Sequence, residues 1–165
     1  GRLQPILRSS GTPGVVSGSM SNSRLYEQDF YAWAMQQAGL LRAGRLSEAD
    51  IDNLAEEIES MGRTEKRELV SRLTVLLRHL LKWRFQPTLR GNSWRNTIRV
   101  QRIALASHLR DNPSLKAMID EALIDGYRIA RIEAENETGL AEQTFPPGCP
   151  WPFHQLASEA FWPDG

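Results

Sequence analysis

The chain has 165 residues, of which 20 are basic and 20 acidic, so its formal net charge is zero at neutral pH. This length suits one domain with a sizeable core, and the single cysteine, Cys149, excludes an intrachain disulfide framework and favours a reducing, cytoplasmic compartment. No apolar run approaches the roughly 20 residues that a bilayer span requires, so we expect no membrane segment.

The first 23 residues differ from the rest in composition. They are rich in serine and glycine and contain no acidic residue and no long aliphatic run. Such a composition cannot offset the entropy of ordering, and a secretory signal would need a longer apolar stretch. We therefore expect residues 1–23 to form a flexible or irregular N-terminal extension and residues 24–162 to form a single helical domain. If translation begins at Met20, most of this extension is absent from the native protein. An organellar transit peptide is the other explanation of its composition.

Two amphipathic segments follow. Residues 24–42 carry aromatic side chains at helical spacing, which predicts a helix. A second helix is predicted between Ser47 and Gly62, because Ser47 and Asp50 resemble a capping box and apolar residues then recur every three or four positions. We expect Gly62 to stop this helix or to bend it into the next.

The strongest helical pattern runs from about residue 64 to residue 85. Its broad leucine stripe predicts contact with two neighbouring helices, and Pro87 ends it. Another helix is predicted over residues 93–110, after a short basic linker. Trp83 and Trp94 occupy apolar stripes on either side of this linker. We therefore expect both rings in the core rather than in a platform that stacks bases.

The C-terminal third contains one long helical pattern over residues 113–136. Gly126 lies within its apolar face, which indicates a close approach to another helix. Prolines prevent regular structure after Gly139, and a short C-terminal helix is expected over residues 152–161. With no strand pattern in the chain, the predicted fold is an all-α bundle of four to five main helices plus this short one.

The charges are strongly segregated along the chain. Residues 63–110 hold twelve basic and two acidic residues, a net charge of +10. Residues 48–59 hold six acids and no base, and residues 111–142 hold eight acids against three bases. This asymmetry indicates either a nucleic-acid-binding face or helices that neutralise one another within a bundle. The totals cancel, which favours neutralisation.

Several separate strings also occur together in one known family. They are Leu25-Tyr26-Glu27, Asp29-Phe30-Tyr31-Ala32-Trp33, Leu41-Arg42-Ala43-Gly44, Leu54-Ala55-Glu56-Glu57-Ile58-Glu59, His79-Leu80-Leu81-Lys82-Trp83, Ser93-Trp94, Thr97-Ile98, Phe145-Pro146 and Cys149-Pro150. Over roughly residues 24–162 the chain thus resembles the bacterial family called domain of unknown function 29. The resemblance implies a compact helical bundle in a bacterial cytosol and carries over no activity.

Three histidines lie on three different predicted helices. His79, His108 and His154 would form a metal site only if their helices converge. No two of them share a helix at a spacing that suits a common ion. The sequence therefore predicts no metal site and no cofactor.

Two arginine–histidine pairs, Arg72 with His79 and Arg102 with His108, resemble the catalytic pair of HEPN ribonucleases. Such spacings arise by chance in arginine-rich helices, and Arg102 and His108 point about 120° apart around their helix. The acidic run 56–59 lacks the second carboxylate motif of the helical pyrophosphatases. No catalytic residue is assigned.

The leading hypothesis is a non-enzymatic interaction or regulatory module that binds an unidentified protein, with self-association also open. The alternative is a nucleic-acid-binding protein that uses the basic face of residues 63–110, or a HEPN-like ribonuclease. Basic side chains interleaved with aromatic rings suit the grip of a phosphate backbone. The candidate binding residues are Arg72, His79, Lys82, Arg84, Arg90 and Arg95.

Overall fold

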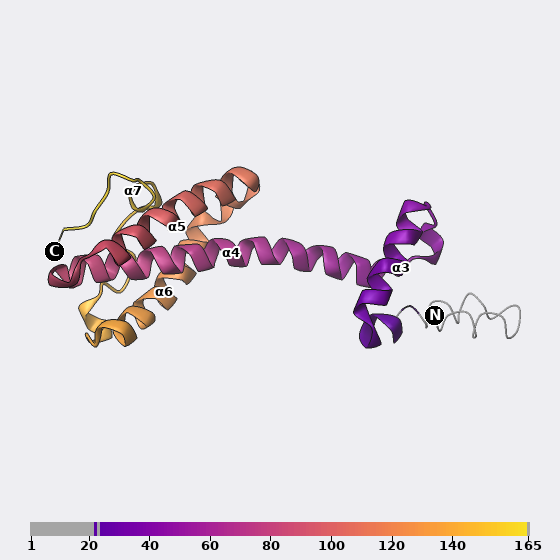
Figure 1. The fold of residues 1–165 in the computed structure, drawn as a ribbon, viewed down its shortest axis with the longest axis horizontal. Helices are drawn as coiled ribbons and strands as arrows, with labels where there is room; N and C mark the ends of the chain where they lie inside the picture. Colours follow the sequence, from indigo (N-terminus) through magenta and orange to yellow (C-terminus); the bar gives the residue numbers. More distant parts are fainter. Residues whose placement is uncertain (1–21, 23, 165) are drawn as a thin grey trace, which may run out of the picture. The chain divides into compact units, whose positions relative to one another are not determined.

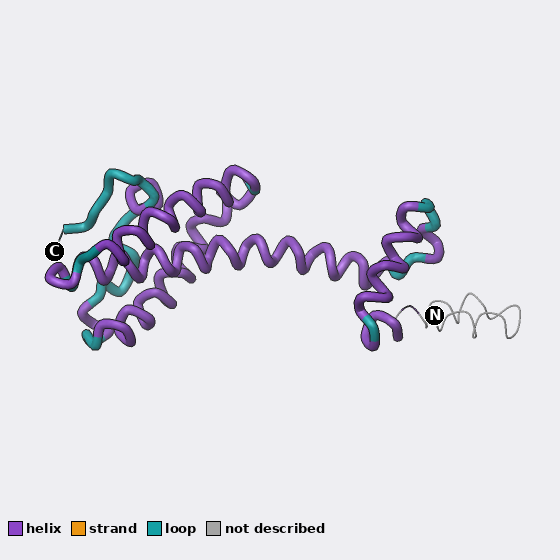
Figure 2. The backbone as a smooth tube through the Cα atoms, in the orientation of Figure 1, coloured by secondary structure: helices purple, strands orange, loops and turns teal. Residues whose placement is uncertain are grey.

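The computed structural model describes residue 22 and residues 24–164, so the expected N-terminal extension lies outside the described residues except for Asn22. All regular structure in the described part is helical, which confirms the all-α class (Figure 2). Figure 1 labels the helices, which are α3 (Phe30–Arg42), α4 (Ile51–Phe85), α5 (Asn92–Asp111), α6 (Ile119–Thr138) and the short α7 (Phe153–Leu156). Among these described helices, none is both long and apolar enough to cross a bilayer.

The chain divides into two compact units, residues 1–62 and residues 63–165. The sequence predicts one domain over residues 24–162, whereas the structure divides the same residues between two units. Its boundary falls within α4, which is continuous from Ile51 to Phe85.

The predicted stop at Gly62 is wrong, because α4 continues through this residue. Gly62 is exposed, and a Cβ placed on it would meet no atom within 4 Å. A single glycine inside a helix costs only about 1 kcal/mol, so the helix formers around Gly62 carry the helix through it. The predicted capping box also fails, because residues Leu46–Glu48 form a short 3-10 helix and α4 begins after Asp50.

In the unit of residues 1–62, the indole of Trp33 is the main buried apolar group. The rings of Tyr26 and Phe30 pack against it, with centroid separations of 4.7 and 5.4 Å. Its Nε1 donates to Oδ2 of Asp50 at 3.0 Å, and the backbone N–H of Asp50 donates to the buried Gln37 side chain at 2.7 Å. These polar contacts fix α3 to the start of α4.

In the unit of residues 63–165, the core is built on the second half of α4. Six of its leucines are fully buried: Leu69, Leu73, Leu76, Leu77, Leu80 and Leu81. The same cluster includes Ile98 and Leu105 from α5, and Ala122 and Ala130 from α6. The broad leucine stripe therefore contacts two neighbouring helices, as predicted.

Gly126 lies at a close approach of α6 to α4. A Cβ on this residue would lie 3.3 Å from Cβ of Leu73 and 3.4 Å from the backbone nitrogen of Thr74. The close helix–helix approach predicted at Gly126 is confirmed.

Trp83 is in the core, with 8% of its surface exposed, and its ring lies 4.7 Å from that of Trp162. Trp94 is half-buried and packs against the same core. The expectation of two core rings therefore holds fully for Trp83 and in part for Trp94. Neither ring is a free surface for stacking bases.

Two predicted helices are shorter than expected. The segment Pro113–Met118 is a 3-10 helix, and α6 starts only at Ile119. The C-terminal helix is confined to Phe153–Leu156. Beyond it the backbone N–H groups of Ser158 and Phe161 donate to carbonyls three residues back, those of Gln155 and Ser158, so the α-helical pattern stops. Arg102 of α5 donates to the carbonyl of Leu156 at 2.9 Å and so ties the end of α7 to α5.

The two helical glycines should respond oppositely to an added side chain. Gly62→Ala should raise the free energy of unfolding by about 0.5–1 kcal/mol, because the site is open and alanine favours helix. Gly126→Val should lower it by about 1–3 kcal/mol through overpacking against Leu73 and Thr74. Urea denaturation of the full chain measures both changes, and a neutral Gly126→Val would contradict the close approach.

Candidate functional site

The six candidate binding residues all make contacts within the fold. Arg72 donates from Nε to Glu68 at 3.1 Å and from a terminal nitrogen to the Gln101 side chain at 3.3 Å. The Nδ1–H of His79 donates to the carbonyl of Val75 at 2.8 Å. Burial of the ring lowers the pKa of His79 below its ordinary value. Arg72 and His79 are therefore held by separate sets of partners.

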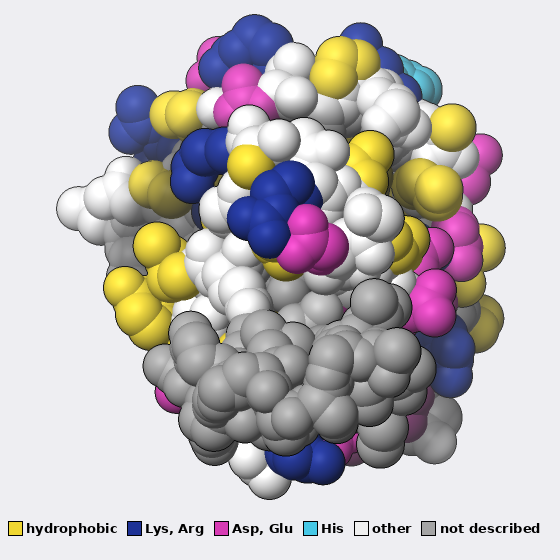
Figure 3. Space-filling model, turned by 90° about the vertical axis from the view of Figure 1, so that its right-hand side faces the viewer, with side chains coloured by type: hydrophobic (Ala, Val, Ile, Leu, Met, Phe, Trp, Pro, Cys, Tyr) yellow, Lys and Arg dark blue, Asp and Glu magenta, His cyan; other side chains and the backbone are white. Residues whose placement is uncertain are grey.

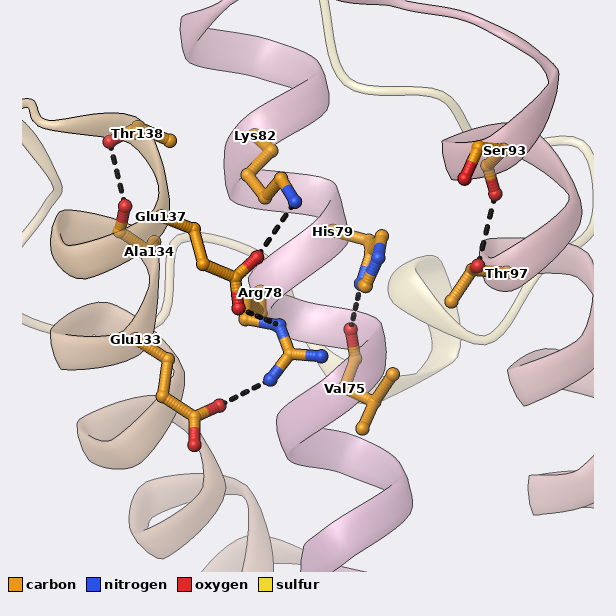
Figure 4. A network of polar contacts seen from close by, with 10 residues as sticks. All are labelled: Val75, Arg78, His79, Lys82, Ser93, Thr97, Glu133, Ala134, Glu137 and Thr138. Atoms are coloured by element: carbon orange, nitrogen blue, oxygen red, sulfur yellow. Dashed lines mark hydrogen bonds and ion pairs between the residues drawn. The ribbon is translucent and has the colours of Figure 1, made fainter.

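Lys82 lies in a network between α4 and α6 (Figure 4). Its Nζ donates to Glu137 at 2.8 Å, and Arg78 reaches both Glu133 at 2.5 Å and Glu137 at 3.2 Å. Burial alone would raise the pKa of Glu137, but the hydrogen bond from Lys82 and the charge of Arg78 hold it below its usual range. Lys82 also lies over the ring of Trp94, 4.8 Å from its centroid. These basic groups are neutralised by acids of the same unit.

Arg90 and Arg95 meet at Trp83. The guanidinium groups lie 5.1 and 5.7 Å from the centroid of its ring. Arg90 also donates to the carbonyl of Trp83 at 2.6 Å and to that of Pro163 at 3.3 Å. Of the six candidates, the structure joins these two at one ring and does not join Arg72 or His79 to them. Arg84 instead lies over the ring of Phe85, at 5.1 Å.

Arg102 is a further residue with a defined role, and the sequence analysis missed that role. It is only 3% exposed, and it donates to the carbonyls of Leu156 at 2.9 Å and Phe161 at 2.7 Å. Its guanidinium lies 5.2 Å from the ring of Trp162, and burial lowers the pKa of Arg102. The signal was its position four residues after Ile98 on the apolar stripe of α5. Arg102 anchors the C-terminal segment to α5.

The three histidines do not gather at one point. In the described part of the chain, the one group of three residues with ligand atoms close enough for a metal is Glu65, Glu68 and His108, all within 4.8 Å of one another. His79 and His154 are not part of it. The sequence analysis missed this group because Glu65 and His108 lie 43 residues apart.

The two arginine–histidine pairs have other partners. Arg102 is bound to backbone carbonyls, whereas the Nε2 of His108 faces the carbonyl of Glu65 at 2.8 Å. Arg72 is bound to Glu68, whereas His79 is bound to Val75. The contacts of both pairs are those of structural residues.

A family model described as "Domain of unknown function DUF29" matches residues 25–162 of the chain. None of the curated proteins and none of the solved structures matches it. The match spans most of the chain and covers every helix from α3 to α7.

Replacing the buried arginine should release the C-terminal segment. Arg102→Met should lower the free energy of unfolding by about 2–4 kcal/mol, because the charged hydrogen bonds to two carbonyls are lost. Amide hydrogen exchange should also become faster in residues 156–163. Arg99→Met is the matched control, since Arg99 is exposed on the same helix and its substitution should change stability by less than about 0.5 kcal/mol. Equal losses in the two variants would contradict an anchoring role.

Proposed function

Because the chain belongs to the DUF29 family, whose description assigns no activity, we propose a function from its surface: it is a non-enzymatic module that binds a helix of another protein. The single cysteine and the resemblance to a bacterial family support a bacterial cytoplasm as its location. Three features of the described residues support the proposal, namely an apolar stripe, the acids beside it and the internal use of the basic residues.

The observation that carries the proposal is an exposed apolar stripe on the first half of α4. It consists of Ile51, Ile58 and Met61, which are 53%, 60% and 62% exposed. Their spacings of seven and three residues place them on one side of the helix. Aligned exposed apolar side chains are typical of a surface that binds another protein. Figure 3 shows hydrophobic side chains exposed among charged ones on one face of the molecule.

The charges beside the apolar stripe favour a particular kind of partner. Residues 48–59 contain six acids and no base. Glu48 pairs with Arg45 and Asp50 accepts from Trp33, whereas Asp52 and Glu59 are exposed. A second copy paired through the same surface would place acid against acid, which opposes association. An amphipathic helix with basic flanks would bury its apolar face on the stripe and pair its charges with these acids. We therefore favour a basic partner helix over self-association.

The basic residues of 63–110 give less support to nucleic-acid binding. Arg78 and Lys82 pair with acids of α6, and Arg90 and Arg102 donate to carbonyls of the C-terminal segment. Each such contact occupies donors that would otherwise reach phosphates. The pattern supports neutralisation within the unit and hence the interaction module.

A photo-reactive amino acid tests the apolar stripe directly. Placed at position 58 in living cells, it should give a light-dependent adduct with one other protein, and peptide mapping should locate the link on a basic amphipathic helix. Position 59 is the matched control, since Glu59 is exposed and lies beside the stripe. Ile51→Glu should abolish the adduct and leave the melting temperature unchanged, because Ile51 is exposed.

Two results would reject this assignment. An adduct at the mass of two copies would show self-association instead, and equal adducts from positions 58 and 59 would show that the stripe has no special role.

A further inference from the structure

Two carboxylates of α4 face a buried histidine of α5. Glu65 and Glu68 are three residues apart, so they lie on the same side of their helix. Their Oε2 atoms are 3.7 and 3.5 Å from Nδ1 of His108. The imidazole is nine-tenths buried, whereas both carboxylates remain close to half-exposed. The cluster lies wholly within the unit of residues 63–165 and is thus built by its packing.

The second nitrogen of His108 determines what Nδ1 can do. Nε2 lies 2.8 Å from the backbone carbonyl of Glu65, and a carbonyl oxygen only accepts hydrogen bonds. Nε2 therefore carries the hydrogen. In the neutral ring, Nδ1 then carries an unshared electron pair, and this pair faces two negatively charged carboxylates. Such an arrangement is repulsive unless Nδ1 carries a second proton or a metal cation lies between the three atoms.

The distances fit a metal ion as that cation. Ligand atoms at about 2.0–2.1 Å from a tetrahedral ion lie about 3.3–3.4 Å from one another. The two separations from Nδ1, 3.5 and 3.7 Å, are within a few tenths of an ångström of this value, and the two carboxylates, whose ligand atoms lie within 4.8 Å of each other, would turn inward around the ion. The hydrogen bond from Nε2 to a carbonyl is also the outer contact that orients most histidine ligands and fixes their tautomer.

We infer that Glu65, Glu68 and His108 bind one divalent transition-metal ion of the zinc class. A nitrogen ligand favours such an ion over magnesium or calcium, which prefer oxygen ligands alone. Arg72 donates to Oε2 of Glu68 at 3.1 Å, which orients this carboxylate and leaves its second lone pair for the ion. Three protein ligands leave a fourth position open to solvent. The bound ion fastens α4 to α5.

Zinc titration of the full, tag-free chain, first stripped of metal, tests the inference. Calorimetry should show one Zn²⁺ bound per chain, and Co²⁺ in its place should give the visible absorption of a low-coordinate site. Glu65→Gln and Glu68→Gln keep the size of the side chain at half-exposed positions. Each should weaken zinc binding by at least about tenfold, the loss that removal of even an outer-shell partner causes.

His154→Gln is the matched control, because His154 is an exposed histidine outside the cluster. It should bind zinc like the unchanged chain. Added zinc should also raise the melting temperature of the unchanged chain and of His154→Gln, but not that of Glu65→Gln.

Two outcomes would overturn the inference. One is the absence of saturable zinc binding. Nitrogen chemical shifts should then show a proton on Nδ1 of His108 in place of the metal ion. The other is zinc binding that Glu65→Gln and Glu68→Gln leave unchanged, which would place the ion elsewhere on the chain.

Discussion

The leucines of α4 between Leu69 and Leu81 retain no exposed surface, and burying each such side chain contributes about 1.5–3 kcal/mol. They cover more than one side of the helix, so several elements must pack around it to remove them from water. Helices α5 and α6 and the C-terminal segment do this, and their buried residues belong to the same core cluster. The close approach at Gly126 shows how tightly one of them is held.

This packing determines where the charges of the second unit lie. Side chains at the border of the leucine stripe, such as Arg78 and Lys82, are brought against the acids of α6. Partly exposed ion pairs contribute only about 0–1 kcal/mol each, so the core rather than the pairs holds the helices together. The face of α6 that meets α4 is the one that carries Ala122, Gly126 and Ala130. Three of the twelve basic residues of 63–110, namely Lys66, Arg78 and Lys82, pair in this way with acids of residues 111–142.

Features that depend on local periodicity were predictable from the sequence. The leucine stripe, the buried Trp83 and the close approach at Gly126 all follow from helical spacing. The predicted break at Gly62 was wrong because a single glycine carries a small cost that neighbouring helix formers offset. The anchoring role of Arg102 and the cluster at His108 depend on partners 43 to 59 residues away, which no local pattern contains.

The central claim is that the contacts of Arg78, Lys82, Arg90 and Arg102 lie within the fold, so that these side chains do not serve phosphates. Fluorescence anisotropy with labelled RNA and duplex DNA at two salt concentrations tests it most directly. The account predicts weak binding that changes little with salt. A protein that makes six or more phosphate contacts loses about 10³–10⁵ in affinity between about 50 and 200 mM salt. A loss of that size would show that these side chains remain available to nucleic acid and would contradict the account.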